Sequence, residues 1–451
     1  MRRRGRRVPA AAGEALGVLT RAADSARLWT AIAAGLALSG GRFRRRAALR
    51  GLFAATLGSA AAGGLARRMP GSERGSTSLP SGAAAGFAFA VGAGQEVPAL
   101  AGPLVGLAGL VAYARVQAGG HQPSAAVAGA VLGVGAAVAT RRLWPVAPHE
   151  PAQVRTALAR AEVEPSPTGK GLVVVINPSA GSSGPAADEL RQELPDAEVV
   201  ELEEGADLGA ALRDAAGRGC ALGVAGGDGS INAAAALAAE RNLPLFVVPG
   251  GTLNHFAYAL GLETFAHAAR AVREGRAVAV DRAVIDGHSF VNTASIGSYV
   301  DLVDAREKLE DRIGKWPAVV VALFRVLRHA SPVELEIDGR RRRVWMVFIG
   351  NCKYHPAGFA PSWRERLDDG LLDVRIVDGT RPWSRLRLLF SVMTGRLARC
   401  GAYEQQWVRR LHVKSLDGEL RLARDGETFD GPQEFTVTKA DDPLVVYVPE
   451  P

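Results

Sequence analysis

Gly-Gly-Asp-Gly-Ser at residues 226–230 is the stretch that decides the fold, together with Pro-Gly-Gly-Thr-Leu-Asn at residues 249–254. Each run follows an apolar, strand-like segment, residues 220–225 before the first and residues 243–248 before the second. Glycine lets a backbone approach a phosphate closely, and consecutive N–H groups in such a loop form a concave anion site. The carboxylate of Asp228 would repel a phosphate unless it acts with a metal ion. The two loops therefore predict an enzyme that binds a nucleoside triphosphate with Mg²⁺.

A third strand and turn precede these loops. Residues 173–176 form an apolar run that leads into Asn-Pro-Ser-Ala-Gly at residues 177–181. A glycine-rich loop alone is weak evidence, but the order of the three strand-and-loop units resembles the catalytic domain of diacylglycerol kinases. That domain shares its fold with sphingosine kinases and, more distantly, with NAD kinases and phosphofructokinases. The pattern is not a Walker-type site, because no Gly-Lys-Ser/Thr follows the glycines.

Two acidic segments nearer the C-terminus extend the resemblance. Residues 367–374 resemble the family's Asp-Gly-x-x-Asp segment, where a structural Mg²⁺ is bound. The resemblance implies that Asp369 supplies a carboxylate, and that Arg366 and Leu371 supply backbone oxygens. Asp-Gly-Glu at residues 425–427 matches the family motif whose glutamate is the proposed general base. Because Asp-Gly pairs are also common hairpin turns, the order of all five segments carries the resemblance.

The resemblance also assigns roles within the site. Asp228 would hold the catalytic Mg²⁺ or orient the acceptor, and Glu427 would accept the proton of the acceptor hydroxyl. His255 stands where many relatives have an aspartate, so one supporting acid of the site is replaced. The residues expected to bind ATP are Asn177, Pro178, Ser179, Ala180, Gly181, Gly226, Gly227, Asp228, Gly229, Ser230, Gly251, Thr252 and Asn254.

The N-terminal third has a different composition. Residues 1–150 contain 18 arginines, no lysine and 5 acidic residues, a net charge of +13, which leaves −5 for the rest of a chain of net charge +8. Its apolar runs are residues 28–38, 47–66, 82–94, 97–114 and 124–140. They lack the charged face of a soluble surface helix, and their small residues suit close packing in lipid. Several are shorter than the ~20 residues that span a bilayer, so a soluble alanine-rich bundle is the alternative.

Basic residues predict how these runs are oriented. Arg141 and Arg142 follow the last run, which agrees with the excess of positive charge on the cytoplasmic side of membranes. Counting back through four spans places the arginines of residues 42–50 on the same side. We therefore expect a multi-pass protein of the cell membrane with the kinase-like part in the cytoplasm. The first run would be re-entrant or interfacial, and residues 2–24 do not form a cleaved signal peptide, because they lack a continuous apolar core.

Two motifs in this region resemble the PAP2 phosphatidic-acid phosphatase superfamily. Pro-Ser-Gly-Ala at residues 80–83 and the segment containing Arg115 and His121 look like its second and third motifs. The family's general-acid histidine is replaced by Ala83, and the aspartate that orients the second histidine by Ala125. Catalytic groups that act as a unit fail together. The resemblance thus implies a degenerate phosphatase domain that serves as an anchor or lipid-binding scaffold, with Arg115 and His121 as vestiges.

The predicted fold has several domains. An N-terminal all-α, PAP2-like membrane bundle covers residues 1–144, followed by a proline-rich linker over residues 145–169 with a short helix over 153–162. An α/β nucleotide-binding lobe of the NAD kinase and diacylglycerol kinase type, with a parallel sheet, covers residues 170–282. A β-rich sandwich lobe that binds the lipid covers residues 283–451, with helices over 316–329 and 383–394. The three cysteines lack metal-type spacing, which favours reduced thiols.

The predicted function is an ATP-dependent lipid kinase, with diacylglycerol as the favoured acceptor and phosphatidic acid as the product. The alternatives are a kinase for another long-chain lipid, such as a sphingoid base or a polyprenol-linked lipid, and a non-catalytic membrane protein that binds lipid or nucleotide. ATP and Mg²⁺ are the expected cofactors, and the lipid substrate and the bilayer are the expected partners. Nucleic-acid binding is not expected, because the excess arginine lies with the apolar runs. A homodimer is left open.

Overall fold

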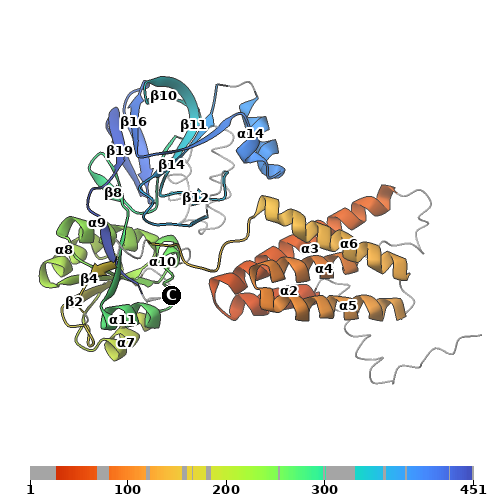
Figure 1. Ribbon diagram of the computed structural model, residues 1–451. Coiled ribbons are helices and arrows are strands. Elements are labelled where there is room, and N and C mark those ends of the chain that lie inside the picture. The colour runs from red at the N-terminus through yellow and green to blue at the C-terminus, as the bar shows by residue number, and fades with distance from the viewer. Residues whose placement is uncertain are drawn as a thin grey trace, which may run out of the picture. The chain divides into compact units, whose positions relative to one another are not determined.

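The computed structural model describes most of the chain, in two compact units, Met1–Ala147 and Pro148–Pro451 (Figure 1). The described residues are 27–68, 81–117, 122–154, 160–164, 166–178, 184–251, 254–297, 300, 331–358, 362–380, 383–425 and 427–448.

The first unit is a bundle of helices (Figure 1). It contains α2 (Arg27–Leu38), α3 (Arg42–Arg68), α4 (Ser81–Glu96), a 3-10 helix (Pro98–Leu100), α5 (Ala101–Gln117) and α6 (Pro123–Leu143). Each of the five apolar runs is therefore helical, as predicted. Helix α4 lies at the centre and contacts α3, α5 and α6.

Small residues let α4 approach its neighbours closely. A Cβ atom at Gly133 of α6 would clash with the carbonyl oxygen of Ala84, and one at Gly92 would lie 2.9 Å from the Cβ atom of Ala54. Trp29, Phe89 and Leu104 are buried in the bundle, whereas other large apolar side chains point outward. On α6 they form an exposed stripe of Val127, Val131, Val134 and Val138. Close contacts at small residues are typical of helices that pack in lipid, and soluble surface helices usually expose a charged face rather than an apolar stripe.

Two helical segments among the described residues are long and apolar enough to cross a bilayer, Pro98–Gln117 and Pro123–Leu143. Helix α3 is longer, but it begins and ends with arginines. Core helices of soluble proteins can have the same length and composition.

A charged cluster closes one end of the bundle. The carboxylate of Glu96, at the end of α4, is fully buried and accepts hydrogen bonds from Arg46 Nε (2.9 Å) and Arg50 Nε (2.7 Å). Both guanidinium groups lie over the ring of Trp144, 5.1 and 4.9 Å from its centroid. Both also donate to the carbonyl oxygen of Pro145, at 3.2 and 3.1 Å. The cluster thus fixes the point where the chain leaves α6.

The second unit begins with an α/β lobe built on a seven-stranded sheet of order β1-β6-β20-β5-β4-β2-β3. Strands β20, β5, β4, β2 and β3 are parallel, and β6 and β1 add antiparallel strands at one edge. The strands are β1 (Arg160–Glu162), β2 (Leu172–Ile176), β3 (Glu198–Glu201), β4 (Ala221–Gly226), β5 (Leu245–Pro249), β6 (Arg276–Val280) and β20 (Leu444–Tyr447). The helices are α7 (Gly184–Glu193), α8 (Leu208–Arg218), α9 (Asp228–Arg241), α10 (His255–Ala259) and α11 (Phe265–Glu274). Because helices cover both faces (Figure 1), strands β2 and β4 are buried throughout.

The β-rich lobe is an eleven-stranded sheet of order β18-β17-β9-β11-β10-β16-β19-β7-β8, in which β14 also pairs with β11, and β15 with β14. Its strands are β7 (Ala283–Ile285), β8 (His288–Phe290), β9 (Thr293–Gly297), β10 (Val333–Ile337), β11 (Arg340–Asn351), β14 (Leu372–Asp378), β15 (Tyr403–Val408), β16 (Arg410–Ser415), β17 (Leu420–Arg424), β18 (Glu427–Gly431) and β19 (Glu434–Lys439). A separate ribbon joins β12 (Tyr354–His355) to β13 (Trp363–Arg364). Helix α14 (Ser384–Met393) and a 3-10 helix (Leu397–Arg399) follow β14.

Two parts of this organisation differ from the prediction. Residues 160–162, predicted to end a linker helix, form strand β1, because they pair with the free edge of β6. Strand β20, predicted to lie in the second lobe, inserts between β5 and β6 of the first sheet. The boundary expected at residue 283 therefore does not separate the two sheets. The helix predicted over residues 316–329 lies outside the described residues.

Candidate active site

The two glycine-rich loops lie side by side because they end neighbouring parallel strands. Gly226 of β4 is paired with Pro249 of β5, and the amide of Gly250 donates to the carbonyl oxygen of Gly226 (2.8 Å). A Cβ atom at Gly251 would lie only 2.6 Å from the Cα atom of Gly227. Glycine is therefore required for this backbone contact. The paired loops form one surface at the carboxyl edge of the sheet, where α/β proteins bind ligands.

Helix α9 begins directly at the first loop, with Gly227 as its N-cap and no side chain capping its first turn. The free N–H groups of a helix N-terminus attract phosphate. The third loop joins here, because Asn177 Nδ2 donates to Ser230 Oγ (2.9 Å) and the Asn177 amide donates to the carbonyl oxygen of Ala225 (2.9 Å). The glycine cradle and the helix N-terminus together fit the phosphates of ATP.

Asn254 holds the second loop in shape. Its side chain accepts a hydrogen bond from the Gly251 amide (2.9 Å) and donates one to the Gly251 carbonyl oxygen (2.7 Å). The backbone of Asn254 is left-handed, with φ 46°. The next amide, that of His255, donates to Asp228 Oδ1 (2.7 Å). The second loop therefore positions Asp228 through its main chain.

The pKa of His255 lies below its ordinary value. Loss of solvation lowers the pKa of His255, the charge of Asp228 opposes this shift, and Arg364 adds to it. The aspartate that many relatives have at this position would bring a carboxylate close to Asp228. The histidine brings an imidazole ring instead, and the backbone contact to Asp228 does not depend on which side chain is present.

Glu427 reaches the first loop from the β-rich lobe. It begins strand β18, and its side chain is exposed. Glu427 Oε1 lies 3.9 Å from the position that a Cβ atom would take at Gly229. The exposed carboxylate therefore stands beside the Asp228–Gly229 segment.

Asp425 fixes the turn that carries Glu427. Its carboxylate accepts three hydrogen bonds, from the amides of Val291 (2.9 Å), Asn292 (2.9 Å) and Thr293 (2.8 Å). Its carbonyl oxygen accepts a hydrogen bond from Asn232 Nδ2 of α9 (3.2 Å). Loss of solvation raises the pKa of Asp425 to about 6, against the effect of the three amides. Asp425 thus joins the two lobes at the site, a role that the short Asp-Gly-Glu motif did not indicate.

Arg364 is a second residue that the sequence did not indicate. Its side chain is buried, and Nη1 donates to the carbonyl oxygens of Val291 (2.7 Å) and Asn351 (3.2 Å). Nη2 donates to Asn292 Oδ1 (3.1 Å), and the guanidinium lies 5.2 Å from the centroid of the Tyr354 ring. Arg364 therefore supports the same backbone segment that binds Asp425. Its signal in the sequence, one arginine in a charged run, is no different from that of a surface residue.

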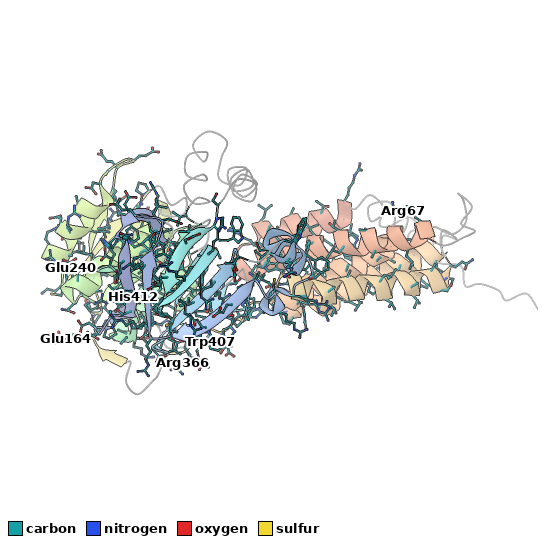
Figure 2. All side chains as sticks on the ribbon, turned by 90° about the horizontal axis from the view of Figure 1, so that it is seen from above. Arg67, Glu164, Glu240, Arg366, Trp407 and His412 are labelled. Carbon is teal, nitrogen blue, oxygen red and sulfur yellow. The ribbon has the colours of Figure 1, made fainter. Side chains whose placement is uncertain are left out.

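The predicted metal segment forms a tight loop. Asp369 Oδ2 accepts the amide of Lys353 (2.9 Å), and Oδ1 accepts the amide of Leu371 (2.9 Å). The Leu371 carbonyl oxygen accepts the amide of Cys352 (3.0 Å). Asp369 and Arg366 are partly exposed, and Figure 2 labels Arg366. One carboxylate with two carbonyl oxygens is the all-oxygen donor set that Mg²⁺ prefers, so the donor chemistry fits.

Asp281 and Cys352, which lie beside Asp369, do not add ligands for a metal ion. The ligand atoms of Asp281, Cys352 and Asp369 lie within 4.8 Å of one another. Lys439 Nζ lies 3.1 Å from Asp281 Oδ2 and 3.3 Å from Cys352 Sγ, and it donates to Asn351 Oδ1 (2.5 Å). Burial raises the pKa of the Cys352 thiol to about 12. The ammonium group of Lys439 already supplies the positive charge beside Asp281. The neutral thiol of Cys352 is a poor ligand for Mg²⁺.

Some expected site residues lie outside the described part of the chain, namely Ser179, Ala180, Gly181, Thr252 and His121. In the helical unit, Arg115 is buried near the end of α5. A Cβ atom at Gly82 would overlap its guanidinium group. The glycine and the arginine of the two phosphatase-like motifs are therefore in contact.

Comparisons with known proteins match the second unit. The model of the diacylglycerol kinase catalytic domain matches residues 171–285, and that of the YegS C-terminal NAD kinase beta sandwich-like domain matches residues 301–442. A "Probable lipid kinase YegS-like" of Pseudomonas aeruginosa strain UCBPP-PA14 is 30% identical over 51% of this chain and 78% of its own length. An uncharacterised protein of Synechocystis sp. is 26% identical over 39% of this chain, and the match spans 42% of that protein, less than half its length.

Solved structures also resemble the chain. A diacylglycerol kinase of Bacillus anthracis strain Sterne is 20% identical, with a TM-score of 0.43 over 62% of this chain and 97% of that one. An NAD kinase of Archaeoglobus fulgidus in complex with ATP is 14% identical, with a TM-score of 0.37 over 62% of this chain and 94% of that one.

Proposed function

Because the chain belongs to the YegS-like lipid kinases, which contain a diacylglycerol kinase catalytic domain and use ATP, we propose that it phosphorylates diacylglycerol at a membrane to give phosphatidic acid. One observation carries the proposal. Glu427 Oε1, on the β-rich lobe, lies 3.9 Å from the Cβ position at Gly229, beside the paired glycine loops. A base and a phosphate cradle therefore face each other across the site.

The proposed reaction needs positioning and charge neutralisation. Glu427 accepts the proton of the acceptor hydroxyl. The oxygen of that hydroxyl forms a bond to the γ-phosphorus of ATP. The bond from that phosphorus to the β,γ-bridging oxygen breaks, and ADP leaves. The glycine loops and the N-terminus of α9 hold the phosphates. Mg²⁺, when bound at Asp228, neutralises phosphate charge, and a structural ion would be held by Asp369 with the carbonyl oxygens of Arg366 and Leu371.

We favour diacylglycerol over a sphingoid base or a polyprenol-linked lipid because the matching catalytic-domain model is that of diacylglycerol kinases. Asp228 and Glu427 are both retained at the site, which opposes a non-catalytic role.

We propose further that the helical unit embeds in the cell membrane and leaves the second unit in the cytoplasm. The exposed valine stripe of α6 and the close contacts of α4 at Gly92 and Gly133 support this placement. The arginines at the start of α3 and at the end of α6 lie at the same end of the bundle, since Arg50 Nη1 donates to Thr140 Oγ1 (3.5 Å). The chain leaves the bundle at that end, which fits the cytoplasmic side. The contact between Gly82 and Arg115 supports an origin of this unit as a PAP2-like phosphatase that now serves as an anchor.

The decisive experiment is an assay of the purified full chain in mixed micelles with labelled ATP, Mg²⁺ and a panel of diacylglycerol, sphingoid base and polyprenol. We expect labelled phosphatidic acid, and at least a hundredfold less with Asp228→Ala or Glu427→Ala, following the usual size of general-base effects, about 10²–10⁴-fold. No labelled lipid from the wild type would overturn the kinase proposal. Label on another lipid alone would reassign the acceptor, and label unaffected by either substitution would remove the proposed roles.

A further inference from the structure

Helix α14 and the residue before it present an apolar face to solvent. Trp383, Leu386 and Phe390 are 74%, 56% and 67% exposed. Their spacing places them on one side of the helix. Among the described residues of the second unit, the remaining exposed large apolar side chain is Trp407, on β15 (Figure 2). The outer face of α14 is therefore where such side chains gather.

The opposite face of α14 is attached firmly to the sheet. Trp345 Nε1, on β11, donates to the buried Ser384 Oγ (3.1 Å). Leu388 packs against the cluster formed by Met346, Val377, Leu397 and Tyr403. The exposure of the outer face is thus not the result of a loosely held helix. Trp383 also has a left-handed backbone, with φ 62°, which is unfavourable for a bulky residue.

The segment that carries this face has charges of one sign. Residues 379–400 contain five arginines and no aspartate or glutamate. Arg387, Arg396 and Arg399 are exposed. Soluble surfaces usually intersperse both signs of charge. A helix with tryptophan, leucine and phenylalanine on one side and arginines around them has the composition of helices that lie in the membrane interface.

We propose that the outer face of α14 docks onto an anionic phospholipid surface. Trp383, Leu386 and Phe390 enter the headgroup region, and the neighbouring arginines pair with lipid phosphates. A second copy of the chain is a poorer occupant, because two such faces would bring arginines against arginines. The inference rests on the proposed lipid-kinase function, since docking would hold the second unit at the surface that contains its substrate.

The test uses the full chain reconstituted in lipid nanodiscs, with Cys220 and Cys400 replaced by serine so that a spin label reacts at one chosen site. The label is placed at Phe390→Cys, and its accessibility to oxygen and to a water-soluble nickel complex is measured. The matched control is Glu240→Cys, an exposed position at the end of α9 that Figure 2 labels. We expect the label at residue 390 to gain oxygen accessibility and lose nickel accessibility in discs containing phosphatidylglycerol, and the label at residue 240 to stay in water.

The charge dependence separates lipid from other occupants. We expect the protection of the label at residue 390 from the nickel complex to fall in pure phosphatidylcholine and in about 0.5 M salt. It should also fall with Arg387→Glu. It should not change with Arg241→Glu, which alters an exposed arginine on α9. A label at residue 390 that stays in water in anionic discs would overturn the proposal. Protection that is equal in both lipids would mean that another part of the chain covers the face, and protection that rises with protein concentration would mean a second copy. Either result would also overturn it.

Kinase assays separate docking from catalysis. The variant Trp383→Ser/Phe390→Asp should lose activity several-fold towards long-chain diacylglycerol in anionic discs and keep its turnover of a water-soluble short-chain diacylglycerol. An equal loss with both substrates would contradict docking, because the face would then act on the fold or on the site. If the wild type did not phosphorylate the short-chain substrate, the proposed function would fail, while the spin-label result would still decide whether α14 binds lipid.

Discussion

Arg364 and Asp425 show how single side chains shape the part of the site that the β-rich lobe contributes. The backbone segment 291–293 lies between them, with its amides bonded to Asp425 and its Val291 carbonyl oxygen bonded to Arg364. Neither residue is at the phosphate cradle itself. Both act by fixing the turn from which Glu427 extends.

Replacing Arg364 tests this arrangement. We expect Arg364→Met to lower the free energy of unfolding by about 2–4 kcal/mol, because buried acceptors lose charged hydrogen bonds worth about 1.5–3 kcal/mol each. Arg364→Lys keeps the charge but not the planar fork, so it should recover part of the stability and little of the kcat. Urea denaturation and steady-state kinetics measure the two effects. A kcat unchanged in both variants would show that Arg364 does not position the site.

The raised pKa of Asp425 predicts a pH dependence. The pKa is about 6 in the folded protein against an ordinary value of 3.8, so the folded state holds the proton more tightly. Stability from this group is present below the unfolded pKa and is lost as the pH rises to about 6. At about 1.4 kcal/mol per pH unit, the loss is roughly 3 kcal/mol.

Thermal or urea unfolding between pH 4 and pH 7 measures this loss, with Asp425→Asn as the comparison. The variant cannot ionise, so its stability should decline less over the same range. If the free energy of unfolding fell equally with pH in both proteins, Asp425 would not be the group responsible for the loss.

At the scale of elements, the site depends on two loops touching backbone to backbone. We expect Gly251→Ala to weaken ATP binding by at least tenfold, because its Cβ atom would meet the Cα atom of Gly227 at 2.6 Å and push the loops apart. The control is Gly217→Ala on α8, where a Cβ atom meets nothing within 4 Å. A helical Gly→Ala change should there stabilise the fold by about 0.5–1 kcal/mol. Nucleotide titration and thermal unfolding of both variants make the comparison, and equal ATP affinities would rule out the contact as a determinant of binding.

Helices, strands and loops were predictable where a local sequence pattern determines them. They were not predictable where pairing with a distant segment determines them. The five apolar runs became helices, and the two glycine-rich loops and the Asn-Pro turn followed buried strands, because periodicity and turn residues are read over short windows. The apolar segment at 444–447 looks the same in either sheet, so its insertion beside β5 could not be foreseen. The bonds of Asp425 join residues more than 130 positions apart, which no short motif encodes.

At the scale of the whole molecule, the charge asymmetry of the sequence coincides with the division into two compact units. The boundary falls between Ala147 and Pro148, close to the end of the strongly basic region. Each unit has its own buried core, one of alanines and aromatic residues and one of strands covered by helices. Such units are expected to fold independently.

Deleting residues 1–147 tests this division. We expect the remaining unit to keep a cooperative unfolding transition and its turnover of short-chain diacylglycerol, and to lose its association with neutral phosphatidylcholine vesicles. Calorimetry, kinase assays and vesicle flotation measure the three properties. Retained flotation with neutral vesicles would show that the helical unit is not the anchor, and a loss of the transition would show that the second unit needs the first to fold.

The hydrogen bond from the His255 amide to Asp228 has a consequence for how freely this position can vary. Since the contact is made by the main chain, a library randomised at codon 255 should yield active clones with side chains of many sizes and charges. Proline has no amide hydrogen to donate, and it also disfavours the left-handed backbone of Asn254 before it. Deep sequencing of the active clones should therefore show tolerance at this position, with proline depleted.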